Sequence, residues 1–281
     1  MAKILYGHTF ATSESIRDDF VSSIFATDIE KLRSLIQRNQ SRFLSLEQSL
    51  SKTKPDKDDL ILTLDDGYAS VYTYVLPLLE KYQVPCILFL TTDFLNGKTA
   101  YEIRLANFIA NKQEIILTGQ KKIDISNRIA KVDTYEKIRG LLKPWSSQKR
   151  NYYLQRIFSM NNYNEMTKKQ NYYLSWGQAK ELANHPLISI GGHTCSHITL
   201  RNKFSLSAYR EVRDSKIELE NNLSIPVTLF SYPYGGNNFI TRRYLAATGY
   251  EYAFTTKQRE VLSWQKEDLF QIPRFDIDKI V

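Results

Sequence analysis

The feature that most constrains the fold is an unbroken apolar run over residues 84–90, with the sequence VPCILFL. A strand that is apolar at every position is typical of a parallel sheet covered on both faces. The preceding segment, residues 71–82, carries apolar side chains at helical spacing, and Pro77 predicts a kink or a shortened helix there. The run is far too short to cross a bilayer, so we expect no transmembrane segment.

Short apolar segments alternate with amphipathic ones along the rest of the chain. This alternation predicts a single α/β domain over residues 1–281, with a parallel sheet and helices outside it. Residues 100–172 are polar and rich in tyrosine and lysine, and we expect a helical insertion there. Further strands are predicted at residues 4–6, 60–64, 187–190, 226–230, 252–255 and 269–277, and helices at 28–37, 175–182, 209–223 and 240–248.

Composition narrows the class of protein. The net charge of +8 is spread along the chain, which favours a solvated basic surface over attraction to an anionic glycan, membrane or nucleic acid. The two cysteines show no zinc-knuckle spacing, so we expect no nucleic-acid partner. The N-terminus lacks the apolar core of a signal peptide, which predicts a cytoplasmic protein; a chain trimmed of an export signal would read the same.

Two adjacent carboxylates, Asp65 and Asp66, follow the predicted strand at 60–64 and precede Gly67. Aspartate and glycine both favour turns, so a plain turn is the alternative. Two adjacent carboxylates repel each other, so they cannot both bind one small ion and also stay well separated. One is therefore expected to bind a metal, while the other acts as a base on the metal's water.

Two of the four histidines, His193 and His197, follow the predicted strand at 187–190. Histidines four residues apart also occur on helices by chance. Here two glycines precede them and allow close backbone approach, and Thr194 and Ser196 are candidates for supporting hydrogen bonds. One carboxylate and two imidazoles suffice to hold a catalytic Zn²⁺ with an open position for water. Cys195, between the histidines, is expected to point away from the metal.

A third segment, Ser231-Tyr232-Pro233-Tyr234-Gly235, follows the predicted strand at 226–230. A rigid turn is the simplest interpretation. The functional interpretation is a wall beside the metal, with the Tyr234 backbone N–H directed at a developing oxyanion.

Together the three segments resemble the polysaccharide deacetylase family, the NodB-homology carbohydrate esterases, over residues 60–95 and 174–275. The resemblance implies a distorted (β/α) barrel with about seven parallel strands. It also implies that Asp65 is the general base and that Tyr234 donates to the oxyanion. Asp66, His193 and His197 would hold a divalent metal, most often Zn²⁺.

Two departures from the family pattern stand out. Ser231 occupies the place where an arginine often braces the base, and Arg274 is the candidate replacement. No histidine follows His197, where the family often supplies a general acid, so His8 is the candidate acid. His185 has no catalytic context. Substrate contacts are expected from Tyr232, Pro233 and Arg274.

The resemblance implies a metal-dependent hydrolase that removes an N- or O-acetyl group from a sugar. The expected substrate is an acetylated sugar, a glycan, or a nucleotide- or lipid-linked precursor used in surface polysaccharide biosynthesis. The alternative is a catalytically weak or inactive homologue that binds glycans. A measurement of metal content distinguishes the enzyme from the glycan-binding homologue, because a pure binding protein need not keep the metal ligands.

Overall fold

The computed structural model describes every residue except 53, 118–120, 166–170, 202–204 and 281. The chain divides into two compact units, and each is described by itself. Unit 1 comprises residues 1–12, 27–98 and 172–281, and unit 2 comprises residues 13–26 and 99–171.

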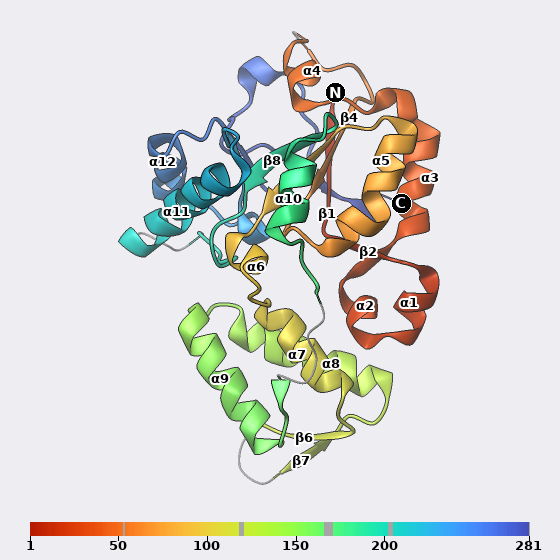
Figure 1. Ribbon diagram of the computed structural model, residues 1–281, viewed down its shortest axis with the longest axis vertical. Helices are drawn as coiled ribbons and strands as arrows, with labels where there is room; N and C mark the ends of the chain where they lie inside the picture. The colour runs from red at the N-terminus through yellow and green to blue at the C-terminus, as the bar shows by residue number, and fades with distance from the viewer. Residues whose placement is uncertain (53, 118–120, 166–170, 202–204, 281) are drawn as a thin grey trace. The chain divides into compact units, whose positions relative to one another are not determined.

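A curled, parallel, seven-stranded sheet forms the centre of unit 1 (Figure 1). Its strands lie in the order β10, β9, β8, β5, β4, β1 and β11. Phe254 at the end of β10 also bridges Ile272, so the segment leading into β11 meets the opposite edge strand. The predicted distorted (β/α) barrel with about seven parallel strands is thereby confirmed. The strands are β1 (Lys3–Gly7), β4 (Leu60–Leu64), β5 (Cys86–Leu90), β8 (Ile188–Gly192), β9 (Leu229–Ser231), β10 (Tyr252–Phe254) and β11 (Phe275–Asp276).

Both faces of the central strands are buried, which explains their uniform hydrophobicity. Side chains alternate between the two faces of a strand. Leu62 and Leu88 accordingly join a cluster with the helices, whereas Ile61 and Ile87 join a separate cluster inside the barrel. Every residue of β4 and β5 is buried. The same alternation assigns Thr63 to the inner face, together with Ile61.

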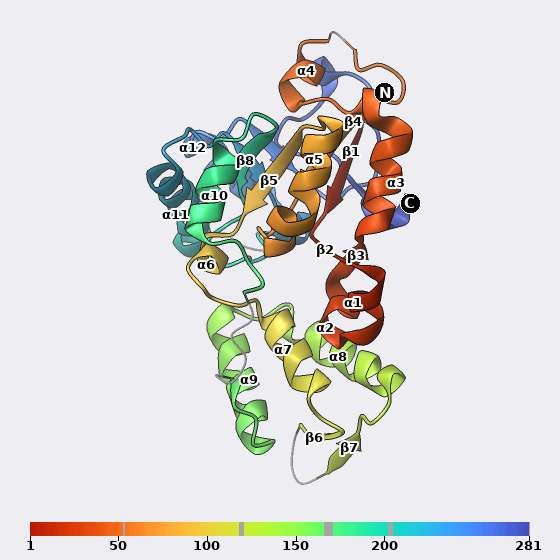
Figure 2. The same cartoon turned by 45° about the vertical axis from the view of Figure 1, so that its right-hand side comes forward.

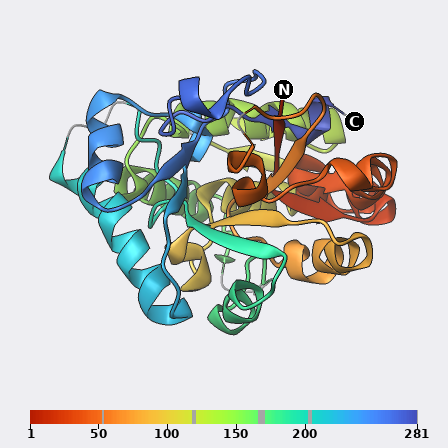
Figure 3. The same cartoon turned by 90° about the horizontal axis from the view of Figure 1, so that it is seen from above.

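Helices cover the outer face of the sheet in chain order (Figure 2). Seen from above, they follow one another around the sheet from orange-red α3 to blue α12 (Figure 3). The start of α10 is fixed by a capping box, in which Ser175 and Gln178 exchange side-chain and backbone hydrogen bonds. These helices are α3 (Ile29–Asn39), α5 (Leu76–Tyr82), α10 (Trp176–Ala183), α11 (Leu206–Leu223) and α12 (Phe239–Ala247).

Pro77 shapes the helix that follows the aspartate pair. Because proline has no backbone N–H, it cannot make the α-helical bond to the fourth carbonyl before it. The helix therefore begins with a π turn over Val71–Val75, closed by the Leu76 N–H on the Val71 carbonyl, and continues as α5. Shorter elements complete the segment: β2 (Thr9–Ala11), β3 (Ala26–Asp28), α4 (Leu46–Leu50) and α6 (Thr92–Leu95).

Unit 2 is mainly helical and contains most of the predicted insertion over residues 100–172. It also contains residues 13–26, which the sequence did not associate with that segment. The Arg128 guanidinium links the two parts by donating to the carbonyls of Ile16 and Arg17. The elements of unit 2 are α1 (Ser13–Asp18), α2 (Phe20–Phe25), α7 (Tyr101–Ala110), α8 (Arg128–Leu142), α9 (Ser147–Met160) and the antiparallel hairpin β6 (Glu114–Ile116) and β7 (Lys122–Asp124).

Within the described residues, no helix combines the length and the apolar character needed to cross a membrane.

Candidate metal centre and active site

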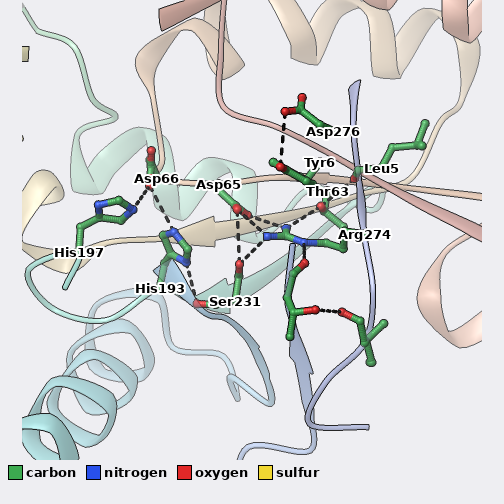
Figure 4. Close-up of polar contacts among 12 residues, drawn as sticks. Leu5, Tyr6, Thr63, Asp65, Asp66, His193, His197, Ser231, Arg274 and Asp276 are labelled. Carbon is green, nitrogen blue, oxygen red and sulfur yellow. Dashed lines mark hydrogen bonds and ion pairs between the residues drawn. The ribbon is translucent and has the colours of Figure 1, made fainter. Parts of the chain in front are cut away.

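All of the candidate site residues except Arg274 come from the carboxyl ends of strands in unit 1, where a (β/α) barrel assembles its active site (Figure 4). Asp65 and Asp66 follow β4, and His193 and His197 follow β8. Ser231 ends β9, and Arg274 directly precedes β11. Parallel pairing of β4, β5, β8 and β9 brings these chain segments to one edge.

Close approach of the backbone around these strands depends on glycine. A Cβ added at Gly191 in β8 would lie 2.4 Å from the Phe89 ring and 2.9 Å from the Leu229 carbonyl. Gly67, directly after the aspartate pair, has a φ of +80°, in the left-handed region that glycine adopts without strain. The turn after β4 and the start of the histidine loop therefore both require glycine.

Asp66, His193 and His197 converge on one point. Asp66 Oδ1 lies 3.4 Å from His193 Nε2 and 3.2 Å from His197 Nε2, and the three ligand atoms lie within 4.8 Å of one another. Asp66 Oδ1 is buried and has no hydrogen-bond partner. A buried carboxylate oxygen without a partner is costly unless a cation satisfies it. Two imidazoles and a carboxylate form a donor set that suits a zinc-class divalent ion, so the residues present fit the metal.

The protonation states of Asp66 and His197 favour metal binding. Burial raises the pKa of Asp66, but the charge of His197 and contact with His193 outweigh it, so the pKa is lowered overall. Burial also lowers the pKa of His197 to about 4, against the opposing charge of Asp66. At neutral pH the carboxylate is therefore ionised and the His197 ring is neutral, which are the forms that bind metals. Burial lowers the pKa of His193, but the charge of Asp65 and contact with Asp66 outweigh it, so that pKa is raised and a metal must compete with a proton there.

A backbone carbonyl orients the first histidine. His193 Nδ1 lies 2.7 Å from the Ser231 carbonyl oxygen. A carbonyl can only accept, so Nδ1 carries the proton and Nε2 is left to face Asp66. The sequence predicted this supporting role for Thr194 and Ser196 instead. The Thr194 hydroxyl is buried without a hydrogen-bond partner, and Ser196 bonds to Glu211.

Arg274 holds Asp65 in a two-pronged ion pair. Its Nη1 lies 2.8 Å from Asp65 Oδ1, and its Nη2 lies 2.7 Å from Asp65 Oδ2. The remaining three donors bind the Thr63 hydroxyl, the Ser231 hydroxyl and the Thr255 carbonyl, so all five guanidinium N–H groups have acceptors. Burial raises the pKa of Asp65, but the charge of Arg274 outweighs it, so the pKa is lowered overall. Asp65 is therefore kept as a carboxylate.

Burial limits the expected substrate contacts. Arg274 and Tyr232 have no exposed side-chain surface, and the Tyr232 hydroxyl donates to the Phe270 carbonyl at 3.1 Å. Pro233 is also buried. The Arg274 guanidinium therefore acts on Asp65 inside the barrel, and neither it nor the Tyr232 ring reaches a substrate in this conformation.

Tyr234 lies beside the candidate metal ligands. Its ring centroid is 4.8 Å from that of His197. Its φ is 58°, and Asp66, Thr194 and His197 also have positive φ values, of 75°, 66° and 53°. Such conformations cost free energy in residues other than glycine and cluster at functional sites. Half of the described non-glycine residues with positive φ gather around this cluster.

The remaining histidines and the loop cysteine differ in their distance from the site. The His8 ring packs edge-on against Tyr6, with centroids 5.7 Å apart, and its charge contributes to lowering the pKa of Asp66. His185 instead faces Glu80, with its Nε2 3.3 Å from the carboxylate. The Cys195 thiol contacts the Glu211 carbonyl at 3.5 Å and does not join the ligand cluster.

Sequence reasoning missed three residues that support the site. Thr63 contacts Arg274, and its signal was a single polar residue on the inner face of an apolar strand. Ser231 acts partly through a backbone carbonyl, which leaves no trace in a sequence. Glu211 lies on a helix, and no local motif connects it to the histidine loop.

Comparisons with known proteins agree with this geometry. A family model described as polysaccharide deacetylase matches residues 52–253. A putative polysaccharide deacetylase of Bacillus subtilis is 35% identical over 86 residues, which cover 31% of this chain and 30% of that protein. The chain thus matches less than a third of that relative's length.

Solved structures share the fold at low identity. The deacetylase PplD of Streptococcus pyogenes, in complex with acetate, matches with a TM-score of 0.59 and 16% identity, over 98% of this chain and 90% of that one. IcaB of Ammonifex degensii gives the same values. The deacetylase domain of BpsB from Bordetella bronchiseptica matches with a TM-score of 0.58 and 17% identity, over 98% and 94%.

Proposed function

Because the chain belongs to the polysaccharide deacetylase family, we propose that it is a metal-dependent hydrolase that removes an acetyl group from a sugar or glycan. The observation that carries this proposal is the buried, unpartnered Asp66 Oδ1 facing two imidazole nitrogens. Asp66, His193 and His197 would hold a zinc-class ion. When bound, such an ion supplies a Lewis acid and lowers the pKa of water that it binds.

Asp65 is proposed as the general base. Its pairing with Arg274 keeps the carboxylate ionised. Oδ2 also accepts the Ser231 hydroxyl at 3.4 Å, so Oδ1 is the oxygen that retains a lone pair for the proton. The carboxylate takes a proton from the attacking water, whose oxygen forms the new bond to the acetyl carbon. The carbon–nitrogen or carbon–oxygen bond to the sugar then breaks, and acetate is released.

Tyr234 is proposed to stabilise the carbonyl oxygen of the acetyl group, and His8 is proposed to protonate the leaving group. We propose that the Tyr234 backbone N–H stabilises negative charge on the carbonyl oxygen of the substrate, and the position of the Tyr234 ring beside His197 supports this role. The leaving sugar amine or hydroxyl needs a proton. His8 is the remaining histidine at the end of β1, and we assign it as the donor.

The proposed substrate is an acetylated glycan, or a nucleotide- or lipid-linked sugar precursor of a surface polysaccharide. Support comes from the family match and from the departure of acetate that the site chemistry implies. The test is a mass-spectrometric screen of acetylated glycans and carrier-linked sugars for loss of acetyl, with the zinc-loaded protein.

Two aspartate variants make the screen specific. Asp65→Asn is expected to keep zinc but lower kcat by about 10²–10⁴-fold, because an amide cannot accept the proton. Asp66→Asn is expected to lose zinc itself. Zinc is counted by elemental analysis alongside the rate. Equal activity and equal zinc content in both variants and the wild type would show that the proposed roles are wrong.

A further inference from the structure

The loop that carries the two histidines is held firmly at its first ligand. The His193 N–H donates to the Leu90 carbonyl at 2.9 Å, and the Thr91 hydroxyl donates to the His193 carbonyl at 3.1 Å. With the Ser231 contact at Nδ1, His193 has three anchors, all at the ends of β5 and β9. Its position is therefore set by the sheet.

The second half of the loop is anchored by two helices instead. The Asp93 N–H in α6 donates to the Cys195 carbonyl at 2.9 Å, and α11 supplies the contacts to Ser196. On α11, Glu211 accepts the Ser196 N–H at Oε2 (2.8 Å) and the Ser196 hydroxyl at Oε1 (2.6 Å). The Glu211 backbone carbonyl also accepts the Cys195 N–H at 3.2 Å. Both carboxylate oxygens thus bind the residue directly before His197, which forms a Glu211–Ser196 clamp.

We propose that Glu211 is a positioning residue that sets His197 as a metal ligand through the Glu211–Ser196 clamp. This inference rests on the proposed metal site. It assigns a role to a residue 14 positions along the chain from His197, on a different element.

The backbone of His197 gives a reason for such a clamp. Its φ of 53° lies in the left-handed region, which is unfavourable for a residue with a Cβ. Residues hold such conformations when their surroundings enforce them. Two charge-assisted hydrogen bonds on the preceding residue supply that enforcement. Without them the backbone can relax and carry the His197 ring away from Asp66.

The two ligands should therefore respond differently to loss of Glu211. His193 keeps its anchors on the sheet, so one imidazole and Asp66 remain in place. Loss of supporting hydrogen bonds behind a metal ligand typically weakens metal binding by 10- to 100-fold. Glu211→Ala is expected to lower zinc affinity by about that factor.

Zinc affinity is measured by competition with a chromogenic chelator, which needs no substrate. The variants are Glu211→Ala, Glu211→Gln and Ser196→Ala. Gln keeps one acceptor and Ser196→Ala keeps the backbone N–H, so both should lose less affinity than Glu211→Ala. The matched control is Glu218→Ala on the same helix, whose carboxylate accepts the Asn96 side chain at 2.7 Å, and its affinity should equal that of the wild type.

A double-mutant cycle separates positioning from general destabilisation. Glu211 and Ser196 act through the same bonds, so Glu211→Ala combined with Ser196→Ala should weaken zinc binding by less than the product of the two single effects. Wild-type affinity in Glu211→Ala, or independent effects in the cycle, would overturn the positioning role and leave the proposed function standing. Failure of the wild-type protein to bind zinc would overturn the proposed metal site itself.

Discussion

At the residue scale, Ser231 connects the two halves of the site. Its carbonyl orients His193, and its hydroxyl accepts the Arg274 Nη2–H at 2.8 Å. The family pattern often has an arginine at this position, and here the guanidinium arrives from the segment before β11. The Arg274 guanidinium donates hydrogen bonds to Thr63, Asp65 and Ser231 on the inner face.

The Arg274 network predicts a large stability effect. Arg274→Met leaves Asp65 buried without a counter-charge, which typically costs about 3–5 kcal/mol. We expect a loss of this order in the free energy of unfolding in urea at pH 7, measured on the metal-free protein. Arg17→Met, which breaks an exposed pair with Asp18, is the control and should have a small effect. Comparable losses in the two variants would contradict the buried role of Arg274.

The same variant predicts a change with pH. In the wild type the pKa of Asp65 is lowered, so its stabilising contribution is present above its unfolded pKa of about 3.9 and is lost as the pH falls through the folded pKa. In Arg274→Met the charges of His193 and His8 still oppose burial, but the largest opposing charge is lost, so the pKa of Asp65 is higher than in the wild type. The stability gap between the two proteins should therefore narrow as the pH falls through the higher Asp65 pKa of the variant and then through that of the wild type. A gap independent of pH would contradict the ion pair as its cause.

At the element scale, the strands were predictable because their burial leaves a simple pattern. β4 and β5 are apolar at every position except Thr63, since one side-chain set packs on helices and the other fills the barrel. The polar residues that end the pattern come directly after the strands, where the site lies. The ends of elements also followed local chemistry, as the Ser175 capping box of α10 shows.

Other elements left no such pattern. β2 and β3 are three residues long and lie where no strand was predicted, and β11 covers only two residues of the strand predicted at 269–277. The clamp from α11 depends on tertiary packing, because Glu211 on an amphipathic helix looks like any solvated acid. Arg274 was a candidate only because Ser231 departs from the family pattern. The five hydrogen bonds of its guanidinium depend on how the sheet closes in the folded chain, which local sequence does not reveal.

Two glycines in different elements predict opposite stability changes. Gly191→Ala in β8 forces a Cβ against Phe89 and the Leu229 carbonyl, and such overpacking costs roughly 1–3 kcal/mol. Gly140→Ala in α8 meets no atom within 4 Å and removes a helix-interior glycine, which should stabilise by roughly 0.5–1 kcal/mol. Urea unfolding midpoints check both. A neutral Gly191→Ala would mean that the β8 backbone can move away from Phe89.

At the scale of the whole molecule, the parallel sheet gathers residues that are far apart in the sequence. Asp65 and Arg274 are separated by 209 positions and still share two hydrogen bonds, because β4 and β11 both flank β1. Solved deacetylases keep this fold at 16–17% identity. What persists at that distance is the alternation of buried strands and covering helices, which many sequences satisfy.

The metal should also stabilise the molecule as a whole. A ligand that binds only the folded state adds about 2.7 kcal/mol at a concentration 100 times its Kd, which for a chain of this size raises Tm by about 5–10 °C. We expect this shift when zinc is added to the chelator-treated protein in a calorimetric melt, because Asp66, His193 and His197 are brought together only by folding. His193→Ala should abolish the shift. His185→Ala is the matched control, since its ring faces Glu80 rather than the ligand cluster, and it should respond like the wild type. An unchanged shift in His193→Ala would place the stabilising zinc at another site.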